Sequence, residues 1–207
     1  MNQTILKTLL AGAATAVLIA VCYLWLDRPA AEAAHGLDGG WRHLARNISL
    51  AADASLFAAL LALGFLAGAC DALRNGQTRR SRHLLYLCAA VAAAIFVGDG
   101  LKDLFGRARP PLLFEKGEYG FLPLAGDYLH SSFPSGHSLR IFASMTALGL
   151  ILPALRYPAL ALAATVGAAR VVALRHYPSD VLFGAFIGVT AALWGWRILY
   201  PYGRRNA

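Results

Sequence analysis

Long apolar runs separated by short polar segments dominate the chain, and this pattern predicts membrane-spanning helices. A helix needs about 20 residues to cross a hydrocarbon core of roughly 30 Å, and six runs approach that length. The expected spans are 5–26, 50–70, 84–101, 135–152, 159–174 and 180–200. Because no repeat or linker divides the sequence, we expect one all-α domain over residues 1–207, a six-transmembrane-helix bundle with its site at one membrane face.

The first run and the polar stretch after it each have two interpretations. The run 5–26 is followed by Ala31-Glu32-Ala33, a small-residue pattern typical of signal-peptide cleavage, but it is longer than the apolar region of such signals. We therefore expect it to remain as a span. Between 27 and 49, Trp41, Leu44 and Ile48 follow helical spacing, which favours a short helix at the membrane interface, with a plain loop as the alternative.

Composition and charge agree with a membrane protein and set its orientation. The chain is 58% hydrophobic and 14% charged, with a mean hydropathy of +0.54 and a net charge of +8. The positive residues lie between and beside apolar runs, so we expect a lipid bilayer and phosphorylated lipids as partners and no nucleic acid. An arginine-rich connection after the second span predicts that both termini are cytoplasmic. Its arginines are Arg74, Arg79, Arg80 and Arg82.

Alternating topology brings a set of polar residues to the opposite, non-cytoplasmic face. The third span ends there, the fourth begins, the fifth ends and the sixth begins. The set comprises Lys102, Arg109, Ser135, Gly136, His137, Arg170, His176 and Asp180. Charged residues at membrane depth cost at least about 2.5–3.5 kcal/mol each on insertion scales, so a gathering of them indicates a functional site.

These residue types suit the chemistry of an oxyanion. Ser135 is a good N-cap for the fourth span, and Gly136 lets an anion approach the first N–H groups of that helix. Lys102, Arg109 and Arg170 supply positive charge. Asp180 follows His176 by about one helical turn, so its carboxylate is expected to accept a hydrogen bond from one ring nitrogen and leave the other free to attack. His137 is then available as the acid.

Simpler structural roles exist for most of these residues taken singly. Lys102 can snorkel to the interface or pair with Asp99, and an isolated His176 is more often a satisfied polar residue than a nucleophile. Arg140, one turn after His137, either reaches a second phosphate or headgroup or snorkels. The segment 111–133, with Phe114, Tyr119, Phe121 and Tyr128, is either an amphipathic lid or an interface-seeking loop. The joint placement of the set favours a site.

The same residues resemble the three-part signature of the type 2 phosphatidic acid phosphatase superfamily. Lys102 precedes Arg109-Pro110 by six intervening residues, Pro134-Ser135-Gly136-His137 follows, and Arg170, His176 and Asp180 complete the signature with matching order and spacing. One departure is Ala169, where the family usually has a serine that supports phosphate binding.

The resemblance implies a phosphatase that needs no metal or other cofactor and acts on lipid phosphates at the outer face of a membrane. In a bacterium this would be the inner membrane. His176 would be the nucleophile and form a phosphohistidine, Asp180 would orient it, and His137 would be the general acid. The implied phosphate ligands are Lys102, Arg109, Ser135, Gly136 and Arg170. The alternatives are a lipid phosphotransferase with the same phosphoenzyme, or an anion-binding or transport protein without chemistry. Phosphatidic acid, phosphatidylglycerophosphate, undecaprenyl diphosphate and lipid A all remain candidate substrates.

Overall fold

The computed structural model describes residues 3–200, and helices account for almost all of their regular structure. The longer helices are α1 (Gln3–Val21), α2 (Asp27–Gly36), α3 (Gly39–Ser49), α4 (Ala54–Asn75), α5 (Arg79–Phe105), α6 (Pro110–Lys116), α7 (Gly136–Ile151), α8 (Arg156–Val172) and α9 (Pro178–Leu199). A π-helical turn, η1 (Cys22–Leu26), and two 3₁₀ turns, η2 (Leu50–Ala52) and η3 (Pro153–Leu155), join some of them. The expected all-α class is confirmed for this part of the chain.

Within residues 3–200, five helical segments are long and apolar enough to cross a membrane. They are Gln3–Gly36, Gly39–Asn75, Arg79–Phe105, Pro153–Val172 and Pro178–Leu199. The remaining expected span, 135–152, is α7, and its 16 residues fall short of the usual membrane-crossing length. The chain is therefore an integral membrane protein, and the count of six spans is not confirmed.

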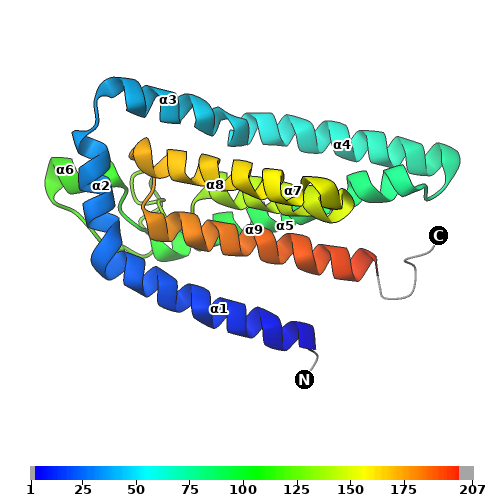
Figure 1. Ribbon diagram of the computed structural model, residues 1–207, viewed down its shortest axis with the longest axis horizontal. Helices are drawn as coiled ribbons and strands as arrows, with labels where there is room; N and C mark the ends of the chain where they lie inside the picture. The colour runs from blue at the N-terminus through cyan, green and yellow to red at the C-terminus, as the bar shows by residue number, and fades with distance from the viewer. Residues whose placement is uncertain (1–2, 201–207) are drawn as a thin grey trace.

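Helix α7 lies at the centre of the bundle and packs against α5, α8 and α9 (Figure 1). Two glycines let α9 approach it closely. A Cβ on Gly184 would lie 2.6 Å from the Ser135 carbonyl oxygen, and one on Gly188 would lie 2.5 Å from the Leu139 carbonyl oxygen. The Ser135 N–H also donates to the Asp180 carbonyl oxygen at 3.1 Å. This packing fixes the first turn of α7 against the first turn of α9.

The stretch 27–49 is helical, so the plain-loop alternative is wrong. Helix α3 is capped by Asp38, which accepts hydrogen bonds from the Gly40 and Trp41 N–H groups. It leads through η2 into α4, and the two helices run along one side of the bundle (Figure 1). Trp41 and Leu44 are exposed, as an interfacial helix requires, but a position at the membrane interface stays a prediction.

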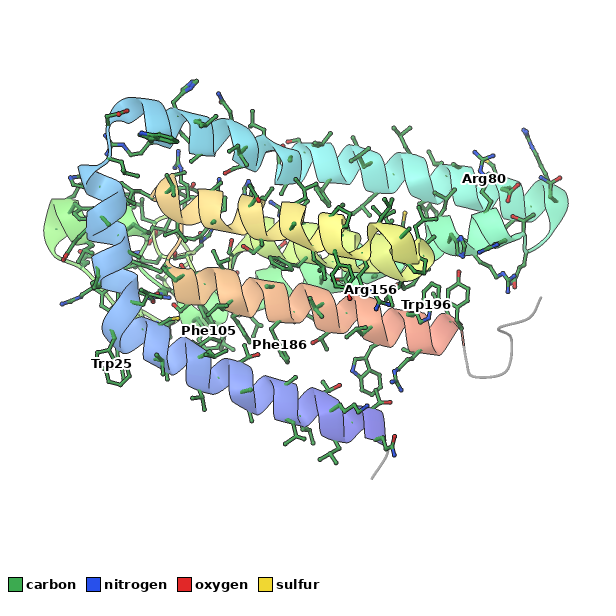
Figure 2. The ribbon with its side chains drawn as sticks, in the orientation of Figure 1. Trp25, Arg80, Phe105, Arg156, Phe186 and Trp196 are labelled. Carbon is green, nitrogen blue, oxygen red and sulfur yellow. The ribbon has the colours of Figure 1, made fainter. Side chains whose placement is uncertain are left out.

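The two ends of the bundle differ in character. Helix α1 begins and α9 ends at the same end as the arginine-rich turn between α4 and α5 (Figure 1). Figure 2 shows Arg80 there, whereas Trp25 and Phe105 lie toward the opposite end. At that opposite end α5 ends, α7 begins, α8 ends and α9 begins, and α2 and α6 lie across it (Figure 1). The expected site residues therefore gather at the end remote from the arginine cluster.

Candidate active site

His176 lies in the connection between α8 and α9, and its side chain is only 3% exposed. Its Nδ1 is 2.8 Å from the Ser132 carbonyl oxygen. Because a carbonyl only accepts hydrogen bonds, Nδ1 carries the proton and the lone pair of the neutral ring is on Nε2. Burial lowers the pKa of His176 to about 4, with Arg109 and Arg170 adding to the effect and Asp180 opposing it. The ring is thus neutral at neutral pH and has the tautomer of an Nε2 nucleophile.

Asp180 is completely buried in the first turn of α9, 3.7 Å from His176 Nδ1. This distance is too long for the direct hydrogen bond expected from the sequence. The Asp180 Oδ2 atom instead accepts hydrogen bonds from Ser132 Oγ and from the Tyr177 N–H, both at 2.7 Å. The carboxylate therefore holds Ser132, whose carbonyl holds the His176 ring. Sequence reasoning missed Ser132, because a backbone acceptor has no residue signature.

His137 lies in the first turn of α7, and its Nδ1 is 3.4 Å from Arg140 Nη2. Arginine only donates hydrogen bonds, so Nδ1 is the acceptor and a neutral His137 carries its proton on Nε2. The Nε2 atom of His176 thus has a lone pair, whereas the Nε2 atom of His137 has a proton to donate. Arg140 is 7% exposed, and its Nε and Nη2 both donate to the Ala52 carbonyl oxygen at 3.1 Å. The snorkelling alternative for Arg140 is therefore wrong.

The start of α7 combines a capped helix with a nearby ammonium. Ser135 Oγ accepts hydrogen bonds from the Ser138 N–H at 3.4 Å and from Ser138 Oγ at 3.0 Å, which confirms the N-cap. The Ser135 N–H already donates to Asp180, so the first N–H groups left for an anion belong to Gly136 and His137. A Cβ on Gly136 would lie 3.0 Å from Lys102 Nζ. Lys102 also forms the ion pair with Asp99 that was one of its simpler structural roles, at 2.8 Å.

The two expected arginine ligands have different surroundings. Arg109 is 6% exposed and donates mainly to main-chain oxygens. These bonds run from Nε to Tyr128 at 2.8 Å, from Nη1 to Arg175 at 3.2 Å and from Nη2 to Ser131 at 3.1 Å. Arg170 is 8% exposed, and its Nε is buried without a hydrogen-bond partner among residues 3–200. A buried guanidinium with an unsatisfied donor fits a side chain whose partner is a bound anion.

The segment after α6 folds over this end of the bundle. Phe114 stacks on His35 with ring centroids 4.0 Å apart, Tyr119 stacks on Tyr23 at 4.9 Å, and the Arg109 guanidinium lies 4.1 Å from the Tyr128 ring centroid. The segment therefore packs on α2, on η1 and on a predicted phosphate ligand. The lid and the interface-seeking loop both stay predictions for this segment.

Ala169, the departure from the family signature, packs with Ala45 of α3 and Ala173 in a small apolar cluster. It is 5% exposed. A small apolar side chain is thus accommodated by the packing of α3 on α8.

Known proteins resemble the chain in sequence and in fold. Lipid A 1-phosphatases of Rhizobium etli and Rhizobium johnstonii are 38% and 37% identical to the chain over 103 and 108 residues. These alignments cover 50% and 52% of the chain and 44% of each relative, so less than half of the relatives' length is represented.

Two crystal structures share the fold. A phosphatidylglycerolphosphate phosphatase of Bacillus subtilis superposes with a TM-score of 0.70 at 19% identity, over 97% of this chain and 99% of that one. LpxE of Aquifex aeolicus superposes with a TM-score of 0.60 at 21% identity, over 84% and 94%. A sequence model of the PAP2 superfamily matches residues 83–204, which is more than half of the chain and includes every signature residue. The chain therefore belongs to the PAP2 superfamily.

Proposed function

We propose that this protein is a membrane phosphatase that hydrolyses a lipid phosphate monoester or diphosphate through a phosphohistidine intermediate. One observation carries the proposal: His176 and His137 have complementary hydrogen-bonding states at Nε2, beside the buried guanidinium of Arg170. A nucleophile, an acid and a buried cation whose Nε has no hydrogen-bond partner among residues 3–200 together suit phosphoryl transfer, which depends mainly on positioning and charge stabilisation.

In the first step, the lone pair of His176 Nε2 attacks phosphorus and the bond from phosphorus to the lipid oxygen breaks. His137 acts in this step as its imidazolium cation, the form that a bound phosphate anion favours. It gives its Nε2 proton to that oxygen and becomes the neutral ring, so the lipid leaves as an alcohol, or as a phosphate if the substrate is a diphosphate. Arg170, Lys102, the remaining N–H of Arg109 Nη1 and the Gly136 N–H stabilise the phosphoryl oxygens. The Ser132 carbonyl accepts from Nδ1–H as the ring gains positive charge.

In the second step, water attacks the phosphohistidine, and the Nε2 lone pair that His137 now has takes a proton from that water. The bond between phosphorus and His176 Nε2 breaks, inorganic phosphate leaves, and both imidazoles return to their starting states. The two steps balance to one water consumed and one phosphate released. No step needs a metal ion, because the cations supply the positive charge.

Lipid A phosphorylated at its 1 position is the substrate that we propose first. Support comes from the two curated relatives, which are both lipid A 1-phosphatases and whose similarity reaches 38% identity. Phosphatidic acid, phosphatidylglycerophosphate and undecaprenyl diphosphate are the competitors.

Purified protein in detergent, given each of the four lipids with and without EDTA, tests this function. We expect many turnovers of free phosphate without an added acceptor, the highest kcat/KM with lipid A, and rates that EDTA changes less than about twofold. A burst limited to one phosphate per enzyme would favour a phosphotransferase. Loss of activity in EDTA that magnesium restores would contradict the metal-free mechanism.

We propose that the site faces the non-cytoplasmic side and that both termini are cytoplasmic. The arginine-rich turn lies at the other end of the bundle, which supports this orientation by the positive-inside rule (Figure 2). In a background with all three cysteines replaced by alanine, Glu115→Cys lies at the site end and Gln77→Cys in the arginine-rich turn, both exposed. A membrane-impermeant maleimide should label Glu115→Cys in spheroplasts and Gln77→Cys only after lysis. The reverse pattern would invert the topology.

A further inference from the structure

Asp27, at the start of α2, is a completely buried carboxylate inside the candidate active site. Its Oδ1 accepts from the Ser179 N–H at 3.0 Å, and its Oδ2 accepts from Arg107 Nη2 at 2.7 Å and from Ser179 Oγ. Two of these three contacts join Asp27 to Ser179, the residue beside Asp180. Asp27 lies outside residues 83–204, the part of the chain that matches the family. The N-terminal segment thus contributes to a site whose recognised residues come from the rest of the chain.

Arg107 connects Asp27 to Asp180. It is 0% exposed, and while Nη2 binds Asp27, Nη1 donates to Asp180 Oδ1 and to Ser179 Oγ. Four aromatic rings enclose its guanidinium, with centroids 4.5–5.6 Å away. They belong to Tyr23, Tyr119, Phe121 and Tyr177. The two carboxylates raise the pKa of Arg107 against the opposing effect of burial. These hydrogen bonds and rings hold the Arg107 guanidinium in a single position.

The hydrogen bonds continue without a break from Asp27 to the histidine. Arg107 donates to Asp27 and to Asp180 Oδ1. Asp180 Oδ2 accepts from Ser132 Oγ, and the Ser132 carbonyl oxygen accepts from His176 Nδ1. Two carboxylates and one guanidinium leave one surplus negative charge. Buried charge is costly unless it is compensated. A cationic His176 ring, which forms when Nε2 attacks phosphorus, supplies that compensation.

We propose that Asp27 is a positioning residue for His176, acting through Arg107 and Asp180 to hold the ring and to stabilise its cationic form. This role rests on the proposed phosphatase function. The charge matters as well as the geometry, because a fixed negative charge favours the imidazolium that the first step creates. The Asp27→Asn variant keeps the size of the side chain and removes its charge, so it separates the effect of the charge from simple packing.

The test measures kcat, KM and the pH profile of lipid phosphate hydrolysis for the wild type and Asp27→Asn. We expect kcat to fall by about 10- to 100-fold while KM changes less than threefold, because the substrate-binding cations are untouched. Loss of the negative charge should also move the acid limb of kcat/KM, set by protonation of His176, to lower pH. Groups that act on this histidine from neighbouring elements, namely Arg109, Arg170 and Asp180, are unchanged.

Tyr86→Phe is the matched control. Tyr86 is also 0% exposed, and its hydroxyl donates to the Ala192 carbonyl oxygen of α9 at 2.8 Å, toward the other end of that helix. The Tyr86→Phe variant should have a lower unfolding temperature than the wild type, with the same kcat and the same acid limb. If Asp27→Asn does not fold, the Ser179→Ala variant replaces it. This change removes the hydroxyl that donates to Asp27 and accepts from Arg107, so it should move kcat and the acid limb in the same direction by a smaller amount.

The outcomes separate this proposal from the function on which it rests. A wild type without phosphatase activity would overturn the function itself. The positioning role would be overturned if the wild type is active but Asp27→Asn has the same kcat and acid limb as Tyr86→Phe, and Ser179→Ala shifts neither. The phosphatase function would then stand, and Asp27 would be a packing residue. A further check is the double variant Asp27→Asn with Arg107→Gln, whose loss should be smaller than the product of the two single losses.

Discussion

Replacing His176 with asparagine is expected to lower kcat by at least about 10⁴-fold, the largest effect of any single change in this chain. Asparagine keeps a group that can donate to the Ser132 carbonyl oxygen, but it has no lone pair in the place of Nε2. The covalent step is therefore lost while the cations that bind phosphate remain. Phosphate release from lipid phosphate by the purified variant, compared with the wild type, measures the effect.

Binding provides the control for the His176→Asn variant. The lipid should still bind, with an apparent Kd within about threefold of the wild-type value, because Arg170 and Lys102 are unchanged. Residual turnover within tenfold of the wild type would rule out His176 as the nucleophile. Retained binding by a wild type that shows no turnover on any lipid would favour a protein that binds or transports anions.

The second large effect is expected from His137→Gln and depends on the leaving group. With a lipid substrate the departing alkoxide needs a proton, and loss of a general acid typically costs about 10²- to 10⁴-fold. Para-nitrophenyl phosphate releases a far weaker base that departs without protonation. The variant should therefore lose activity on lipid phosphate by that factor. The rate at which it forms the phosphoenzyme from para-nitrophenyl phosphate should change little. Burst amplitudes in stopped flow measure this step directly.

Arg170→Gln is the contrasting variant for the leaving-group test. Its guanidinium stabilises the phosphoryl oxygens rather than the departing oxygen, so it should slow both substrates by similar factors. Equal losses on both substrates in His137→Gln would mean that this histidine stabilises charge or structure and is not the acid.

The sequence predicted that the signature residues gather at one end of the bundle, because they lie at helix ends that topology brings together. Ser135 as the N-cap of α7, the alternative of a Lys102–Asp99 pair and a short helix between 27 and 49 are confirmed. Each follows from local chemistry: a serine before an apolar run, opposite charges one turn apart and helical spacing. Nothing beyond neighbouring residues was needed to predict them.

The parts that the sequence missed depend on long-range contacts. Arg107 and Asp27 are 80 positions apart, and a charged residue at the end of an apolar run is ordinarily a snorkelling group. Ser132 acts through its carbonyl, which every residue has. The direct Asp180 contact to His176 was expected from spacing alone, and the capping geometry of α9 turns that carboxylate to Ser132 and the Tyr177 N–H instead. Helix α7 is shorter than its apolar run suggested.

A phosphoryl group trapped on His176 tests the central claim most directly. Purified protein is mixed with lipid phosphate carrying a labelled phosphorus, quenched in alkali during turnover, and digested for mass spectrometry under basic conditions. We predict label on the peptide that contains His176, stable in base and lost in acid, and absent from His176→Asn. Full turnover without a phosphorylated peptide, or label that survives His176→Asn, would contradict the covalent mechanism.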